Sequence, residues 1–195
     1  MDKVIKFFLI IFIFLAFMFL QACMDVAVSG AQAVYNRNSI QNFLNDHYIN
    51  IKTNQAIFWK SDDFKESNIS INTFNNNVLL TGQTPSPSLQ KKAGDITKKI
   101  PGVDEVYNFI EISTPTSAIV QLSDSWITSK IQAQLIANND INPDKIKIVT
   151  ENGTVYLMGI VPPEQAEIAT DIARTTSGVQ NVVRLFLYVK ITKKL

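Results

Sequence analysis

Residues 151–159 read ENGTVYLMG, and this stretch decides the fold because it joins two short β-strands through a tight turn. Asn152 and Gly153 tolerate a positive φ at little cost, so the pair favours a two-residue hairpin loop. Isoleucines alternate with lysines over residues 145–148, and apolar residues continue over 155–159. The stretch therefore predicts an antiparallel hairpin with one face in a core.

The same pattern occurs earlier in the chain, at an offset of about 77 residues. Residues 75–82 read NNNVLLTG and correspond to the hairpin. Upstream, DHYI at 46–49 corresponds to DSWI at 124–127, and downstream PGVDEV at 101–106 corresponds to SGVQNV at 177–182. Two copies of one small domain account for all of these matches.

Each copy reads as helix, strand, strand, helix, strand. In the second copy we expect an opening helix capped by Ser123 or Asp124 and ending near Ala137, and another helix after Pro162-Pro163. Within the opening helix, Ile127, Ile131 and Leu135 are spaced to face a core. The last strand, 182–189, is nearly all apolar, so we predict that it is central in its sheet or covered on both faces. The first copy follows the same plan, with a less regular opening helix over 39–58.

Leu20-Gln21-Ala22-Cys23 closes an apolar run and contains the only cysteine in the chain. The run begins at Phe7, after Lys3 and Lys6, and it is shorter than the roughly 20 residues of a transmembrane helix. This pattern resembles bacterial lipoprotein signal peptides, which are cut before a cysteine that carries diacylglycerol. We therefore expect Cys23 to be the first mature residue and to carry diacylglycerol and an N-acyl chain.

Two other interpretations fit the same residues. The apolar run could be an uncleaved signal anchor, or Cys23 could be a buried thiol in a helix. Under the lipoprotein interpretation, the residue after Cys23 is Met24 and not the aspartate that commonly retains a lipoprotein in the inner membrane. We therefore expect a lipid-anchored protein on the periplasmic face of the outer membrane.

Charge and cysteine content narrow the classes of function. The 195 residues include 18 Lys and Arg and 17 Asp and Glu, and loss of residues 1–22 removes Asp2, Lys3 and Lys6, which leaves the mature chain formally neutral. A neutral chain attracts nucleic acid poorly, so we expect no nucleic-acid partner. Because the only cysteine is expected to carry lipid, the domains must fold on their hydrophobic cores without disulfides.

These patterns divide the chain into five segments. They are a signal peptide (1–22), a lipidated tether (23–38), a first domain (39–112), a hinge (113–121) and a second domain (122–191). The hinge is too short to let the domains move independently, so we expect them to pack or to hold a limited range of angles.

The repeat resembles the BON domain, the bacterial osmotic-stress and nodulation domain. The marks are a hydrophobic residue and glycine ending the second strand, at 80–82 and 157–159, and Gly-Val-x-x-Val at the entry to the last strand; both copies carry both. The resemblance implies an α+β fold of two tandem BON domains, each α-β-β-α-β with two helices packed on a three-stranded mixed sheet. A lipobox before two such copies is similar to the dual-BON outer-membrane lipoproteins that maintain envelope integrity.

In that family the second domain binds anionic phospholipid through its first helix. Carried over to this chain, the matching residues are Trp126, Ile131 and Ile136, with Lys130 nearby. The chain departs from the family at Gln132, where close relatives have an arginine that attracts the lipid head group. Lys130, Lys145 and Lys147 could substitute for that charge.

Trp126 supports lipid contact independently of the resemblance. On a helix it lies about 100° from Ile127 and shares a face with Lys130 and Ala133, so it need not point into the core. Indole prefers the membrane interface, and a lysine near an anionic surface contributes about 1 kcal/mol. Alternatively, Trp126 covers the edge of its own core or packs on the first copy. Tyr48 is its equivalent in the first copy, where we do not expect lipid binding but leave it open.

The sequence offers little for catalysis. His47 is the only histidine and has no nucleophile motif around it, and one histidine with one lipidated cysteine cannot build a zinc site. Asp62, Asp63 and Glu66 read as a solvated loop. We therefore expect no enzyme, no catalytic residue, no metal and no cofactor other than the acyl chains on Cys23.

Taken together, the sequence predicts a non-enzymatic outer-membrane lipoprotein whose second BON domain binds anionic phospholipid and supports envelope integrity. The alternative is a periplasmic protein-interaction or chaperone-like adaptor, for example one for the outer-membrane barrel-assembly machinery. Such an adaptor would use an exposed sheet or hairpin surface instead of the helix that contains Trp126.

Overall fold

The computed structural model describes residues 30–60 and 62–188, with side chains described from residue 41 onward. The apolar N-terminal run and Cys23 lie outside these residues. The chain divides into two compact units, Met1–Ile40 and Gln41–Leu195, and both hairpins of the repeat belong to the second unit. Over the described residues, no helix is long and apolar enough to cross a membrane.

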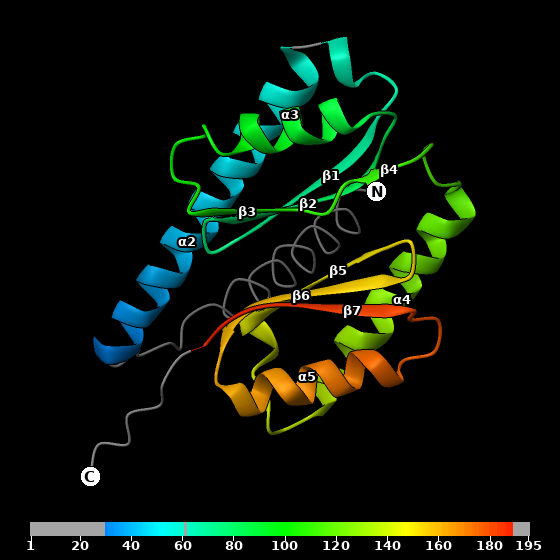
Figure 1. Cartoon of the computed structure of the whole chain (residues 1–195). Coiled ribbons are helices and arrows are strands. Elements are labelled where there is room, and N and C mark those ends of the chain that lie inside the picture. Colours follow the sequence, from blue (N-terminus) through cyan, green and yellow to red (C-terminus); the bar gives the residue numbers. More distant parts are fainter. Residues whose placement is uncertain (1–29, 61, 189–195) are drawn as a thin grey trace, which may run out of the picture. The chain divides into compact units, whose positions relative to one another are not determined.

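The first copy combines two α-helices with a sheet of four strands (Figure 1). Its helical segments are α2 (Gly30–Asn54), η2 (Gln55–Trp59), η3 (Asp62–Phe64) and α3 (Pro87–Thr97). Its strands are β1 (Asn68–Phe74), β2 (Asn77–Thr84), β3 (Glu105–Asn108) and β4 (Glu111–Ile112). β2 is central, because it pairs antiparallel with β1 and parallel with both β3 and β4.

The second copy repeats this plan with an unbroken last strand. Its helical segments are α4 (Ala118–Ala137), η4 (Pro143–Lys145) and α5 (Pro163–Thr175). Its strands are β5 (Ile146–Glu151), β6 (Thr154–Val161) and β7 (Asn181–Tyr188), with β6 between antiparallel β5 and parallel β7. The predicted α+β fold with mixed sheets is confirmed. The first copy departs from three strands only because Phe109 and Ile110 separate β3 from β4.

A tight turn joins the first two strands of each sheet, as predicted. Asn152 and Gly153 have φ of 48° and 72°, and Asn75 and Asn76 have φ of 46° and 63°. Two consecutive positive φ values define the hairpin turn whose twist matches that of the flanking strands. Asparagine and glycine are the residues that adopt this conformation at the lowest cost.

The glycine near the end of each second strand lies against the backbone of the first strand. A Cβ at Gly82 would lie 2.0 Å from the carbonyl oxygen of Asn68, and one at Gly159 would lie 2.7 Å from that of Lys145. No side chain fits at these distances. The hydrophobic-Gly mark of both copies is therefore a requirement of strand packing.

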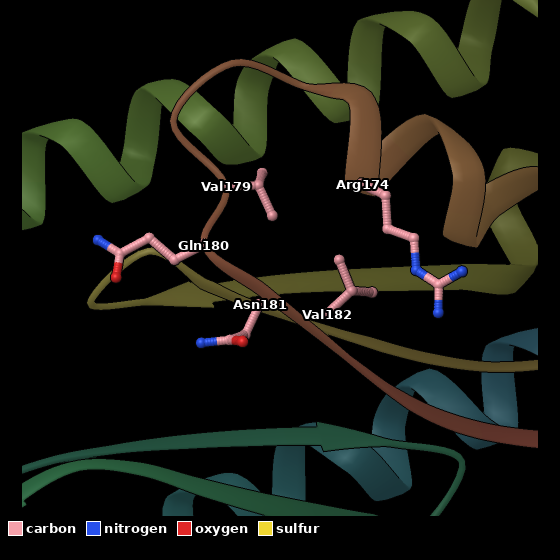
Figure 2. Close-up of a pocket in the computed structure, with 5 residues that line it drawn as sticks. All are labelled: Arg174, Val179, Gln180, Asn181 and Val182. Carbon is pink, nitrogen blue, oxygen red and sulfur yellow. The ribbon is translucent and has the colours of Figure 1, made fainter.

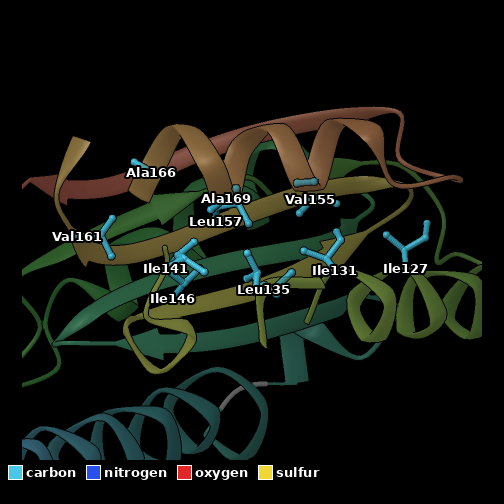
Figure 3. Close-up of a cluster of buried hydrophobic side chains, with 12 residues drawn as sticks. Ile127, Ile131, Leu135, Ile141, Ile146, Val155, Leu157, Val161, Ala166 and Ala169 are labelled. Atoms are coloured by element: carbon cyan, nitrogen blue, oxygen red, sulfur yellow. The ribbon is translucent and has the colours of Figure 1, made fainter. Parts of the chain in front are cut away.

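Each copy has its own core between its helices and its sheet. In the second copy, α4 contributes Ile127, Ile131 and Leu135, and Figure 3 shows Ala166 and Ala169 of α5 facing the same cluster. The spacing of four residues places the three α4 side chains on one helical face, so this face is committed to the core.

The two sheets pack on one another through the faces that carry no helix. Their shared apolar cluster contains Leu79, Val149, Tyr156 and Met158. Beside it, the side-chain amide of Gln83 donates to the Glu151 carboxylate at 2.8 Å, and the Lys147 ammonium donates to the Thr73 carbonyl at 3.1 Å. The short linker predicted that the domains either pack or hold a limited range of angles, and these contacts correspond to the first alternative.

Both opening helices begin earlier than predicted. α2 starts at Gly30, so it includes part of the segment 23–38 that we expected to be a tether. α4 starts at Ala118, and the hydroxyl of Ser117 accepts a hydrogen bond from its first turn. The prediction that Ser123 or Asp124 caps this helix was wrong, because both lie inside it.

Within the described residues β7 lies at the edge of its sheet, so of the two alternatives predicted for this strand, a central position or two covered faces, the first does not apply. The prediction of two covered faces holds for much of the strand. Val182 and Phe186 pack on the helix-side core, whereas Val183 and Leu185 join the cluster between the sheets. Its apolar sequence therefore reflects two covered faces and not two neighbouring strands.

Candidate functional site

Large apolar side chains line α4 on the side away from the core. They are Ile119, Leu122, Trp126 and Ile136, with exposed fractions of 79%, 71%, 65% and 63%. Spacings of three and four residues align the first three along the helix, and Ile136 extends the line toward its C-terminal end. We call these four residues the α4 stripe.

The structure brings together only part of the predicted lipid-binding set. Trp126 and Ile136 belong to the α4 stripe, whereas Ile131 is 0% exposed and lies in the domain core. Ile131 follows Trp126 by five positions, which places its side chain about 140° away around the helix. The prediction that Ile131 contacts lipid was therefore wrong, and its role is to hold α4 on the sheet.

Lys130 is half-buried and already has a partner. Its ammonium donates a hydrogen bond to the backbone carbonyl of Ser177, in the loop between α5 and β7. An ammonium has three N–H donors, so Lys130 can keep this bond and still donate to a lipid phosphate. Gln132, the next residue after Ile131 on α4, is also half-buried.

Two residues of the α4 stripe, Ile119 and Leu122, were not among the residues predicted from the sequence to bind lipid. Ile119 fell in the predicted hinge, and Leu122 fell at the boundary of the second domain, because the helix was expected to begin at Ser123 or Asp124. The spacing of Ile119, Leu122 and Trp126 is the signal that could have extended the helix toward its true start.

The acidic side chain of α4 does not face the stripe. Asp124 is the single acidic residue in the helix, and it is only 7% exposed. Its two carboxylate oxygens accept hydrogen bonds from the backbone N–H groups of Asn152 and Gly153, each at 2.8 Å. The carboxylate of Asp124 thus binds the hairpin turn inside the domain, and α4 presents no carboxylate beside its exposed apolar residues.

Several groups with a displaced pKa lie in the layer between the two sheets. Burial raises the pKa of the Glu151 carboxyl, and burial raises the pKa of Tyr156 to about 12. Burial lowers the pKa of the Lys147 ammonium. These shifts share desolvation as their main cause, so they reflect the dryness of the contact between sheets. In the described part of the chain, no group of three potential His, Cys, Asp or Glu ligands could hold a metal.

A hollow of about 300 Å³ lies beside the start of β7. Figure 2 shows Arg174 from α5 on one side and Val179, Gln180, Asn181 and Val182 from the segment that enters β7 on the other. None of these side chains is a nucleophile, and none belongs to the α4 stripe. The hollow therefore offers no catalytic arrangement.

Known proteins resemble this chain over most of its length. The family model of the BON domain matches residues 45–114 and 123–190. Outer membrane lipoprotein DolP of Haemophilus influenzae is 30% identical over 178 residues, which cover 89% of this chain and 92% of that protein. The 21 kDa hemolysin of Actinobacillus pleuropneumoniae is 37% identical over 127 residues, or 65% of each chain. Osmotically-inducible protein Y of Escherichia coli is 28% identical over 157 residues, covering 79% of this chain and 78% of that protein.

Proposed function

The chain belongs to the BON-domain family, and we propose that it is an outer-membrane lipoprotein whose second BON domain binds anionic phospholipid. The match of the family model to both copies confirms the predicted pair of domains. The lipid-binding part of the proposal rests on one observation, the exposed α4 stripe.

The α4 stripe suits a membrane interface for a physical reason. Burial of apolar surface is favourable by about 25 cal/mol per Å², so a row of exposed large side chains is costly unless something covers it. Trp126 carries the indole ring that is enriched at membrane interfaces, where the ring is dehydrated and its N–H stays hydrated. Because α4 turns its carboxylate inward, the helix can approach an anionic surface without repulsion from its own side chains.

Cys23 supplies attachment in this proposal. With diacylglycerol and an N-acyl chain on Cys23, each buried methylene contributes about 0.8 kcal/mol, so the anchor alone holds the protein at the bilayer. The α4 stripe then determines which lipids the domain contacts, at the high local concentration that the anchor imposes. The name of the Haemophilus influenzae relative, an outer membrane lipoprotein, supports this location.

A vesicle titration of the chain that starts at Met24 tests lipid binding without the anchor. The chain has two tryptophans, so Trp59→Phe leaves Trp126 as the only indole. We expect its emission to shift to the blue on phosphatidylglycerol or cardiolipin vesicles, and Leu122→Ser to weaken binding by about tenfold or more. Ile112→Ser, which alters an exposed apolar residue on β4, is the matched control. An unshifted emission, or equal effects of the two serine variants, would contradict the proposal.

The role in envelope integrity is tested in cells. Cys23→Ser should release the protein from the membrane, whereas Trp126→Ser should leave it attached. If lipid recognition supports the envelope, both variants should fail to restore detergent resistance to cells that lack the protein. Full restoration by Trp126→Ser would separate the envelope role from lipid binding.

The adaptor remains the second candidate because β7 has a free edge. Among the residues that the structure describes, this eight-residue strand pairs with β6 on one side only, and seven of its residues are uncharged. An exposed strand edge can accept a further strand from a partner protein. Photo-crosslinkers at Arg184 and at Leu122 would discriminate between the candidates: protein adducts at Arg184 without vesicle binding would favour the adaptor.

A further inference from the structure

The first domain exposes an apolar row at the positions that match the α4 stripe. The row consists of Leu44, Tyr48, Ile51 and Phe58, with exposed fractions of 58%, 47%, 41% and 36%. Leu44, Tyr48 and Phe58 are the counterparts, one repeat earlier, of Leu122, Trp126 and Ile136. We call this row, which runs along α2 and into η2, the α2 stripe.

The α2 stripe is not needed for the core of its own domain. Ile49, Thr53 and Ile57 lie on the other side of the same helical segment and are 1%, 0% and 0% exposed. Ile49 and Ile57 join the apolar cluster of the first domain. As in the second copy, one helical face completes the core and another carries apolar side chains that the domain does not use.

The charges of α2 leave this face free of negative charge. Asp46 is the only acidic residue in the helix, and its two oxygens accept hydrogen bonds from the N–H groups of Asn75 and Asn76, each at 2.8 Å. Lys52 lies over the ring of Tyr48, with its ammonium 5.6 Å from the ring centroid. The α2 stripe thus combines apolar side chains with a cation, which suits an anionic lipid interface and not a neutral apolar partner.

The chain length between the anchor and α2 selects the bilayer as the occupant. The segment from Cys23 to Gly30 spans at most roughly 25 Å when fully extended. Leu44 lies about 21 Å along the helix from Gly30, at 1.5 Å per residue. An acylated Cys23 would therefore keep the α2 stripe within reach of the membrane that holds the acyl chains.

We propose that the α2 stripe is a second membrane-docking surface, so that each BON domain contacts anionic phospholipid through its own opening helix. This inference rests on the proposed lipid-binding function and extends it to the first domain. Tyr48 takes the interfacial position of Trp126, and Ile51 adds an apolar contact where the second domain has Ser129.

The test uses the chain from Met24, which keeps every element that the structure describes. In the reporter variant Tyr48→Trp, Trp59→Phe and Trp126→Ser, the only indole lies in the α2 stripe and the α4 stripe has lost its tryptophan. We expect a blue shift on phosphatidylglycerol vesicles, quenching by brominated phosphatidylglycerol, and loss of both when Leu44→Ser and Ile51→Ser are added. Ser88→Trp in the Trp59→Phe, Trp126→Ser background places the indole on exposed α3 of the same domain and should not shift.

The result for Trp126 alone, in Trp59→Phe, separates the two proposals. If Trp126 shifts and the position 48 reporter does not, the α2 stripe is not a lipid surface and the proposed function stands. If the position 48 reporter shifts and Trp126 does not, the α2 stripe is supported and the assignment of lipid binding to α4 fails. A blue shift that grows with protein concentration in the absence of vesicles would mean that a second copy covers the α2 stripe, which would also overturn the inference.

Discussion

The carboxylate of Asp124 on α4 accepts a hydrogen bond from the backbone N–H of Gly153 at 2.8 Å. Its other oxygen accepts one from the N–H of Asn152 at 2.8 Å, so one buried side chain satisfies two donors of the β5–β6 turn. Asp46 makes the same pair of bonds to the β1–β2 turn of the first copy. In each domain, a carboxylate therefore fastens the opening helix to the hairpin.

Asp124→Ala should destabilise the second domain strongly. It removes two charge-assisted hydrogen bonds and leaves the N–H of buried Gly153 without its acceptor, which should lower the free energy of unfolding by about 2–4 kcal/mol. Urea unfolding followed by circular dichroism measures this loss. Asp171→Ala, at an exposed position on α5, is the control and should change the free energy by less than about 0.5 kcal/mol. Equal urea midpoints for the two variants would mean that the two hydrogen bonds to Asp124 do not contribute to the stability of the domain.

Local signals in the sequence predicted the hairpins but not what holds them. Asn152-Gly153 prescribes its turn through backbone preference alone, so the turn could be predicted from adjacent residues. The bond from Asp124 joins residues far apart in the chain, and an aspartate near a helix start is equally suited to capping. The structure resolves this choice, because Ser117 caps α4 and Asp124 is free to reach the turn.

In the candidate site, too, some residues could be predicted from local spacing and others could not. Trp126 could be predicted because its spacing from Ile127 places it off the core face. The four-residue spacing of Ile127, Ile131 and Leu135 predicted a core position for Ile131, and the structure confirms it. The family match placed Ile131 in the lipid-binding set instead, because such a match does not determine which way a helix faces. Ile119 and Leu122 were missed because the helix start was placed too late, and the exposed row becomes visible only once α4 begins at Ala118.

Ile131 and Ile136 should respond in opposite ways to truncation. Ile131→Ala opens a cavity in the core and should lower the free energy of unfolding by about 2–4 kcal/mol, with little change in the vesicle affinity of the folded protein. Ile136→Ala removes a 63% exposed side chain and should weaken vesicle binding with little change in stability. Urea unfolding and vesicle cosedimentation measure the two effects. The same loss of affinity in both folded variants would return Ile131 to the lipid-binding surface.

Glu151 should make stability depend on pH. Burial raises the pKa of its carboxyl above the ordinary value of 4.5, and the nearby charges of Asp124 and Glu111 act in the same direction, whereas the hydrogen bond from Gln83 opposes them. The folded state thus holds the proton more tightly than the unfolded state does. The stability from this group is therefore complete below pH 4.5 and is lost as the pH rises through the folded-state pKa.

Glu151→Gln isolates this contribution, because the glutamine carbonyl can still accept the hydrogen bond from Gln83. We expect the variant to gain stability relative to the natural protein as the pH rises from 4.5 to neutral. Urea midpoints of both proteins, measured across this pH range, give the difference in their stability. The other carboxyl groups titrate alike in both proteins, so their contribution to this difference largely cancels. A difference that stays constant with pH would show that Glu151 titrates as it does in the unfolded chain.

Gln132→Arg should strengthen binding to anionic vesicles. Gln132 precedes Ile136 by one helical turn, so an arginine there would place a cation beside the end of the α4 stripe. One additional cation near an anionic surface contributes about 1 kcal/mol, which corresponds to roughly a fivefold gain in affinity. Trp126 emission in the Trp59→Phe chain measures this gain on phosphatidylglycerol vesicles, and added salt should reduce it.

Gln132→Met controls for the longer apolar stem of arginine. A similar gain in affinity from Gln132→Met, or from Gln132→Arg on neutral phosphatidylcholine vesicles, would contradict the prediction. It would show that the α4 stripe binds lipid through apolar contacts alone, without a contribution from the charge of the head group.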